Sequence, residues 1–217
     1  MEFEKASALP TEMYMIGAGF GGWSWESEGV ARLSKTPWKD GCFVITRFFK
    51  AGEGFKFSPA KDWGPSFAGM GTNSDNVAFD GDGNVVVPSD GLWTISINVP
   101  DNTLTLQPTE IMMIGDCVTG GWDAPAVAGA VDIVSGTATV IAQEAGNLRT
   151  YCKSAFDWWQ HEFTPTAEGG IRYRGLWIPD EGASNYGEGA NAELPGFAVA
   201  KGAKVTFNFN EGTTTVE

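Results

Sequence analysis

The residues with the most distinctive chemistry in this sequence are tryptophans that recur near a basic residue. They form two sets of three, one in each half of the chain: Trp23, Lys56 and Trp63, then Trp122, Arg149 and Trp158. An indole is a large, rigid apolar plate, and a cation donates charge-assisted hydrogen bonds. Both suit a sugar, which has apolar C–H faces and a rim of hydroxyl groups. The two sets therefore predict two carbohydrate-binding sites.

Each tryptophan also has a purely structural interpretation, which is burial in a core. Trp23 and Trp122 both follow Gly-Gly, which favours surface loops. The second set is ambiguous because Trp159 directly follows Trp158 and could take its place. Trp93 alternates with isoleucines and is predicted to be a core residue. The remaining tryptophans that the pattern leaves unassigned are Trp25, Trp38 and Trp177.

The elements that must position these residues occur twice. Glu12-Met13-Tyr14-Met15-Ile16-Gly17 returns as Glu110-Ile111-Met112-Met113-Ile114-Gly115, and a Gly-Gly-Trp follows each copy. The offset is 98 residues at the isoleucine and 99 at the tryptophan. A period near 100 residues indicates tandem domains rather than a solenoid. We expect a tail at 1–11, modules at 12–108 and 109–217, and a short joint at Pro108 that holds the modules in a fixed relation.

Each half has the pattern of an all-β domain. Apolar and polar residues alternate in short runs separated by glycine-rich turns, which is typical of a β-sandwich. The predicted strands are Met13–Gly17, Cys42–Phe49, Gly54–Ser58, Val85–Val87, Leu92–Val99, Thr103–Gln107, Ile111–Gly115, Val131–Ile133, Thr137–Ala142, Leu148–Lys153, Arg172–Ile178, Phe197–Ala200, Val205–Asn210 and Thr213–Val216. Because neighbouring side chains in a strand face opposite ways, Lys56 and Arg149 should point away from the core, toward solvent or a ligand.

Composition excludes several classes of function. The formal net charge is −13, which opposes binding to nucleic acid or to anionic lipid. No apolar run approaches the roughly 20 residues of a membrane span. The single histidine, His161, rules out histidine-rich metal sites and is predicted to lie at the surface. Three cysteines are predicted to be buried free thiols, although Cys117 and Cys152 could pair.

The first ten residues lack the basic start and apolar stretch of a signal peptide. The protein is therefore expected to be either cytosolic or a piece of a longer secreted precursor.

The repeated motifs resemble a known family. Met15-Ile16-Gly17, Gly21-Gly22-Trp23, Phe55-Lys56-Phe57, Trp63, and a closing strand with an Asp-Asn turn are similar to the tandem starch-binding modules of the SusE and SusF lipoproteins of gut Bacteroidetes. The resemblance covers residues 12–217. It implies two tandem immunoglobulin-like, carbohydrate-binding-module-type β-sandwich domains that bind α-glucan without catalysis. It also implies a lipid anchor at the outer membrane and a role beside an importer in polysaccharide uptake. A monomer is the default expectation for modules arranged in a row, and no cofactor is expected.

The resemblance also carries site residues over to this chain. Sites of the family combine an aromatic pair and a Lys or Arg with an amide or a carboxylate. Trp23, Lys56 and Trp63 match this pattern in the first module, and Trp122, Arg149 and Trp158 match it in the second. The polar partner is then Asn84 or Asp90 in the first module, and Asn185 or Asn191 in the second; Asp90 and Asn191 are the predicted site residues.

Two further classes of function remain as alternatives. A glycoside hydrolase would need two carboxylates across a cleft, and the candidates are Glu26, Glu28, Asp157 and Glu162. Of the carboxylates, only Asp62 and Asp157 occur at matching places in both halves, directly before Trp63 and Trp158. Either could instead accept a hydrogen bond from a sugar hydroxyl. The other alternative is an adhesion or assembly module with no glycan site.

A calcium site is a weaker possibility. Asp80-Gly81-Asp82-Gly83-Asn84 resembles the start of a calcium loop, but Val85 and Gly91 stand where such a loop needs glycine and glutamate. A polar turn between strands is the favoured interpretation.

Overall fold

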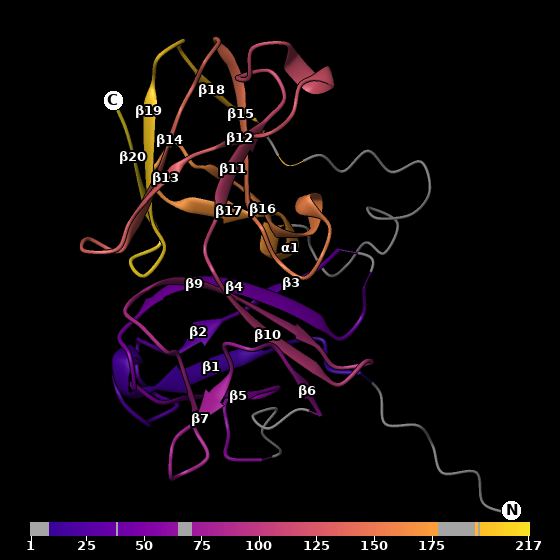
Figure 1. Ribbon diagram of the computed structural model, residues 1–217, viewed down its shortest axis with the longest axis vertical. Helices are drawn as coiled ribbons and strands as arrows, with labels where there is room; N and C mark the ends of the chain where they lie inside the picture. The colour runs from indigo at the N-terminus through magenta and orange to yellow at the C-terminus, as the bar shows by residue number, and fades with distance from the viewer. Residues whose placement is uncertain (1–8, 38, 65–70, 178–193, 195) are drawn as a thin grey trace, which may run out of the picture.

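The computed structural model describes residues 9–37, 39–64, 71–177, 194 and 196–217. Two β-sandwich domains lie one above the other along the long axis of the molecule (Figure 1). This arrangement confirms the predicted all-β fold of two tandem sandwiches. None of the helices in the described part of the chain has the length and apolar character needed to cross a membrane.

The first domain contains two five-stranded sheets. One has the order β2-β1-β5-β8-β7, with β1 (Tyr14–Gly17), β2 (Ala31–Arg32), β5 (Phe55–Ser58), β7 (Ala78–Phe79) and β8 (Val85–Val86). The other has the order β3-β4-β9-β10-β6, with β3 (Ser34–Lys35), β4 (Cys42–Phe49), β6 (Thr72–Asn73), β9 (Gly91–Asn98) and β10 (Thr103–Pro108). A 3₁₀ turn, η1 (Ala18–Phe20), follows β1. Alternate side chains of both sheets, among them Phe43, Phe55 and Ile95, fill the core between them.

The second domain repeats this plan. Its larger sheet has the order β12-β11-β15-β16-β17, with β18 also on β15; the strands are β11 (Ile111–Ile114), β12 (Val127–Ala128), β15 (Gly146–Cys152), β16 (Glu162–Pro165), β17 (Ile171–Tyr173) and β18 (Phe197–Val199). The smaller sheet is β13-β14-β19-β20, with β13 (Ala130–Asp132), β14 (Thr137–Ile141), β19 (Lys204–Asn208) and β20 (Thr213–Val216). Three short helical turns complete the described part of this domain: η2 (Gly121–Asp123), η3 (Trp158–His161) and α1 (Arg174–Trp177).

One predicted strand is wrong in its second half. The run Arg172–Ile178 alternates, but the strand ends at Tyr173 and the chain turns into α1. Gly175 explains the turn: a Cβ at this position would lie 1.7 Å from the carbonyl oxygen of Lys35 in the first domain. The chain therefore comes into close contact with β3, which an isolated strand pattern does not reveal. The cysteine prediction is confirmed, since all three cysteines are buried free thiols.

The two domains are joined by more than the peptide at Pro108. The side chain of Asn210 accepts a hydrogen bond from the backbone N–H of Phe48 at 2.8 Å and donates to the carbonyl of Phe48 at 3.2 Å. Gln160 Nε2 donates to the carbonyl of Pro37 at 2.8 Å. Leu92, on β9, is buried in the apolar cluster of the second domain. These contacts hold the two sandwiches in one relative orientation.

Candidate functional site

The first pair of predicted tryptophans meets at the surface. Trp23 lies in the loop after η1, where Gly21 and Gly22 both adopt positive φ. Trp63 lies in the loop after β5, where Asp62 Oδ1 accepts a hydrogen bond from the N–H of Gly64 at 2.9 Å. The two ring centroids are 6.3 Å apart with an interplanar angle of 35°. Trp23 is 39% exposed and Trp63 is 59% exposed, so neither is a core residue.

A third indole belongs to this cluster. Trp25 is partly buried, and its ring centroid lies 5.3 Å from that of Trp63 at an angle of 58°. The spacing Trp-Ser-Trp at 23–25 is the signal that could have indicated it. The offset of 99 places Ala124 at the matching position of the second domain, so the two sites differ here.

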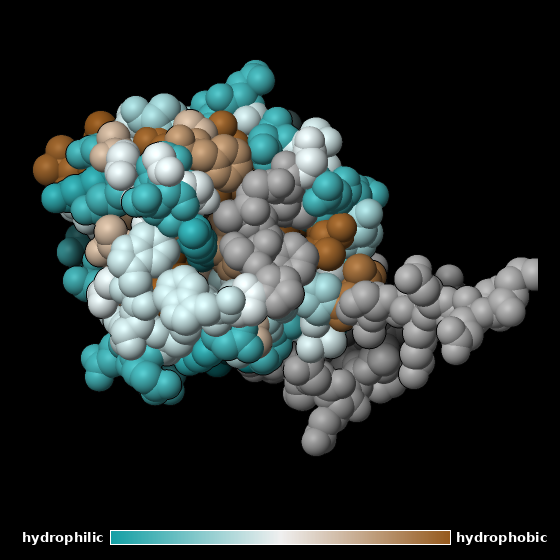
Figure 2. Space-filling model, turned by 90° about the horizontal axis from the view of Figure 1, so that it is seen from below, coloured by the Kyte–Doolittle hydropathy of each residue, from teal (hydrophilic) through white to brown (hydrophobic). Residues whose placement is uncertain are grey.

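Seen from below, the surface of the first domain shows flat aromatic rings of intermediate hydropathy exposed among hydrophilic side chains (Figure 2). Lys56 lies opposite Ile16 of β1 and is partly exposed, as expected for a residue facing away from the core. The contact that the structure gives its Nζ is with the carbonyl oxygen of Asp82, at 3.5 Å. A lysine on a flexible four-carbon stem at this position can swing between that turn and a ligand.

The predicted polar partners of the first site hold turns. Asp90 Oδ1 accepts a hydrogen bond from the N–H of Ala51 at 2.8 Å. Asn84 donates its side-chain N–H to Asp80 Oδ2 at 2.7 Å, and Asp80 Oδ1 accepts the backbone N–H groups of Asp82 and Asn84. These hydrogen bonds, led by that from the Asn84 side chain, lower the pKa of Asp80. The loop is therefore a self-satisfied polar turn, and no cluster of metal ligands occurs among the described residues.

The second pair of tryptophans repeats the geometry of the first. The ring centroids of Trp122 and Trp158 are 6.4 Å apart with an interplanar angle of 44°. Trp122 is 50% exposed, and its Nε1 donates to Asp116 Oδ1 at 3.1 Å. The sequence left Trp158 and Trp159 open; Trp158 makes this pair, whereas the ring of Trp159 lies 5.8 Å from the guanidinium of Arg174.

Arg149 occupies the place in the second domain that Lys56 occupies in the first, opposite Ile114 of β11. Of the two expected surroundings for this cation, solvent or a ligand, exposure to solvent is wrong, because Arg149 is only 7% exposed. Its Nε forms an ion pair with Glu162, and its guanidinium lies 5.4 Å from the ring centroid of Trp122. Burial of this cation depends on the carboxylate that comes from the neighbouring strand, β16.

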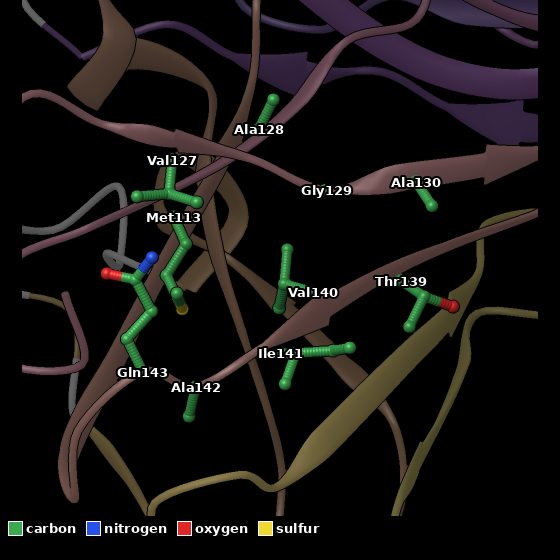
Figure 3. Close-up of a pocket in the computed structure, with 10 residues that line it drawn as sticks. All are labelled: Met113, Val127, Ala128, Gly129, Ala130, Thr139, Val140, Ile141, Ala142 and Gln143. Carbon is green, nitrogen blue, oxygen red and sulfur yellow. The ribbon is translucent and has the colours of Figure 1, made fainter.

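The other predicted residues of the second site, Asn191 and its alternative Asn185, lie outside the described residues. A cavity of about 520 Å³ in this domain lies between the β12–β13 segment and β14 (Figure 3), and neither Trp122 nor Trp158 is among its lining residues. It is lined mainly by small apolar side chains such as Ala128, Ala130 and Val140. Such a lining offers few hydrogen-bond partners to a hydroxyl-rich ligand.

His161 is not at the surface, contrary to expectation. It is 1% exposed, its Nδ1 lies 3.2 Å from the carbonyl oxygen of Cys152, and its ring stacks on Tyr173. Burial lowers its pKa from 6.5 to about 4. The imidazole is therefore neutral and inside the fold at neutral pH, which removes it from consideration as a catalytic base at the surface.

This depressed pKa predicts that acid destabilises the protein. Between pH 6.5 and about 4 the unfolded chain binds a proton at His161 that the folded chain excludes. Stability from this group is complete above pH 6.5 and is lost as the pH falls toward 4. Between pH 7.5 and 5.0 we expect the titration of His161 to lower the free energy of unfolding by about 2 kcal/mol, measured by urea denaturation. A His161→Gln variant should lack this part of the pH dependence; an identical dependence in both proteins would contradict the assignment.

Comparison with known proteins assigns the two halves of the chain to one family. The sequence model of the SusF/SusE starch-specific carbohydrate-binding modules matches residues 12–106 and again 110–215. The chain belongs to this family. Each matched segment of the SusF/SusE type contains one of the two tryptophan pairs, and the match confirms the resemblance seen in the repeated motifs.

A curated relative and a solved structure agree with this membership. The chain is 28% identical over 237 aligned residues to outer membrane protein SusF of Bacteroides thetaiotaomicron, covering 98% of this chain and 44% of SusF. The crystal structure of SusF from the same organism superposes with a TM-score of 0.80 at 25% identity, covering 97% of this chain and 48% of that one. The chain thus spans about half the length of these relatives.

Proposed function

We propose that this chain is a non-catalytic starch-binding protein in which each of two modules, 12–108 and 109–217, binds α-glucan on an exposed tryptophan pair. One observation carries the proposal. Two pairs of partly exposed indoles, at equivalent places in two domains, have nearly the same separation, 6.3 and 6.4 Å. Core packing gives no reason for large apolar rings to be repeated in this way at a surface.

The tilt of the rings suits a curved glucan. The interplanar angles are 35° and 44°, so the two plates of a pair face successive sugars of a chain that bends. Arg149 lies against the second pair, with its guanidinium 5.4 Å from the ring centroid of Trp122. We place Lys56, on β5, beside the first pair by analogy with Arg149, and in either site the cation can donate hydrogen bonds to sugar hydroxyl groups. Membership of a family described as starch-specific supports α-glucan over other polysaccharides.

The same membership supports a place at the cell surface. The relative SusF is named an outer membrane protein. We extend this location to the present protein and place it in a polysaccharide-uptake system beside an importer, as a monomer that holds glucan near the membrane.

The contacts of Glu162, one of the candidate carboxylates for glycoside hydrolysis, make it unsuitable for that reaction. Glu162 is 1% exposed and forms ion pairs with Arg149 and Arg174. A carboxylate bound by two guanidinium groups is a poor general acid and has no open face toward a substrate. His161, the other group near it, is buried.

Native electrophoresis in gels that contain polysaccharide tests the proposal. We expect amylopectin to retard the full chain and a β-glucan gel to leave it unretarded. Because two sites in a fixed relation engage one polymer, the apparent affinity for amylopectin should exceed that for maltoheptaose by at least about tenfold. Migration unaffected by any α-glucan would favour the adhesion alternative, and reducing ends released during incubation would favour the hydrolase.

A further inference from the structure

Glu162 is a buried carboxylate in the second domain that binds two cations at once. Its Oε1 contacts Arg149 Nε, and its Oε2 contacts Arg174 Nη1 at 2.8 Å. The side chain of Glu162 has no exposed surface, and both arginines are nine-tenths buried. Buried charges of this kind persist only where they are paired, so the three side chains fix one another.

The two arginines in turn lie against indole rings. The guanidinium of Arg149 is 5.4 Å from the ring centroid of Trp122, and that of Arg174 is 5.8 Å from the ring centroid of Trp159. A cation over an aromatic face attracts the ring. Trp122 is one of the two plates of the second glycan site, so its orientation depends on where Glu162 holds Arg149.

Within its described residues, the first domain lacks this arrangement at the equivalent place. Lys56 there is partly exposed and contacts a backbone carbonyl. The strand that takes the place of β16, on the side of β5 away from β1, is β8, whose two residues are valines. The two cations are therefore held differently: a partly exposed ammonium in the first domain and a buried, ion-paired, planar guanidinium in the second.

Arg174 extends the cluster to the domain boundary. It begins α1, whose Gly175 lies against the carbonyl of Lys35 on β3 of the first domain. The second site is thus built on a support that includes the neighbouring sandwich.

We propose that Glu162 is a positioning residue of the second glycan site: it holds Arg149 against Trp122 so that ring and cation meet the sugar in a fixed relation. Glu162 itself does not touch the ligand, because it is buried beneath both arginines. The proposal rests on the glucan-binding function proposed above.

The test isolates the second site in the full chain by the substitution Trp63→Ala. In that background, Glu162→Gln should lower the association constant for maltoheptaose, measured by titration calorimetry, about fivefold to tenfold. The near-ultraviolet circular dichroism of the indoles should change as well. A double-mutant cycle supplies the decisive readout: once Arg149→Met is present, Glu162→Gln should cause no further loss of binding.

Should Glu162→Gln fail to fold, Glu162→Asp keeps the charge but is one methylene shorter and cannot reach both arginines. It should bind maltoheptaose more weakly than its parent and show an altered indole spectrum. A folded variant of either kind with parental affinity would overturn the proposal, and so would an equal loss with and without Arg149. If the Trp63→Ala parent itself binds no maltoheptaose, the proposed function of the second site fails instead.

Discussion

A protein with both Trp63→Ala and Trp158→Ala is expected to migrate through an amylopectin gel as fast as through a plain gel. Loss of one stacking plate costs a site about 1–3 kcal/mol, by analogy with the stacking of nucleobases on aromatic side chains. The double variant loses a plate in each site and also the gain from binding one polymer twice. Each single variant should show intermediate retardation.

The matched control is Ile141→Ala, which removes an exposed apolar side chain from β14, in the sheet of the second domain that carries neither Trp122 nor Arg149. It should be retarded like the parent. Because Trp63 is 59% exposed and Trp158 is a partly exposed residue at the start of η3, the double variant should keep its parental unfolding transition. Parental retardation of a folded double variant would show that the paired indoles are not the binding surface.

The second large effect is expected in the core of the second domain. Phe163 is fully buried, and its ring contacts those of Phe207, Phe209 and Tyr173 at centroid distances of 5.0, 5.4 and 5.7 Å. Phe163→Ala removes these contacts and leaves a cavity. The free energy of unfolding, measured in urea, should fall by about 3–5 kcal/mol.

The same substitution at Phe79 provides the control. Phe79 lies on β7 at the edge of its sheet and is 41% exposed. Phe79→Ala should change the free energy of unfolding by no more than about 1 kcal/mol. Similar losses at the two positions would mean that Phe163 does not have the central place that its ring contacts indicate.

Much of the fold was predictable because alternation is a local property. β4 and β20 have the bounds that the pattern indicates, and the 98-residue offset identifies two copies of one plan. The two-residue strands β2, β3, β6, β7 and β12 escaped because so few residues cannot alternate; β8 was indicated by the run Val85–Val87. α1 escaped because its cause is the approach of Gly175 to another domain, which no window of sequence contains.

The site shows the same limit. The tryptophan pairs could be predicted from their repetition and from the glycines before Trp23 and Trp122. The choice of Trp158 over Trp159 depends on how η3 is oriented, and the burial of Arg149 depends on Glu162 from a different strand. The lone carboxylate in Glu162-Phe163-Thr164 is the sequence signal for a partner of Arg149. From the sequence it was only a candidate catalytic group of a glycoside hydrolase.

The packing of Leu92 means that the two domains cannot be separated cleanly by truncation. It belongs by sequence to the first sandwich and by packing to the core of the second, next to Phe48. Cutting the chain at Pro108 would remove Leu92 from the core of the second fragment. It would also expose apolar side chains on the first fragment that the second one covers. Measurements on truncated halves would therefore reflect the destabilisation caused by the cut. The contributions of the two halves are best separated by point substitution in the intact polypeptide.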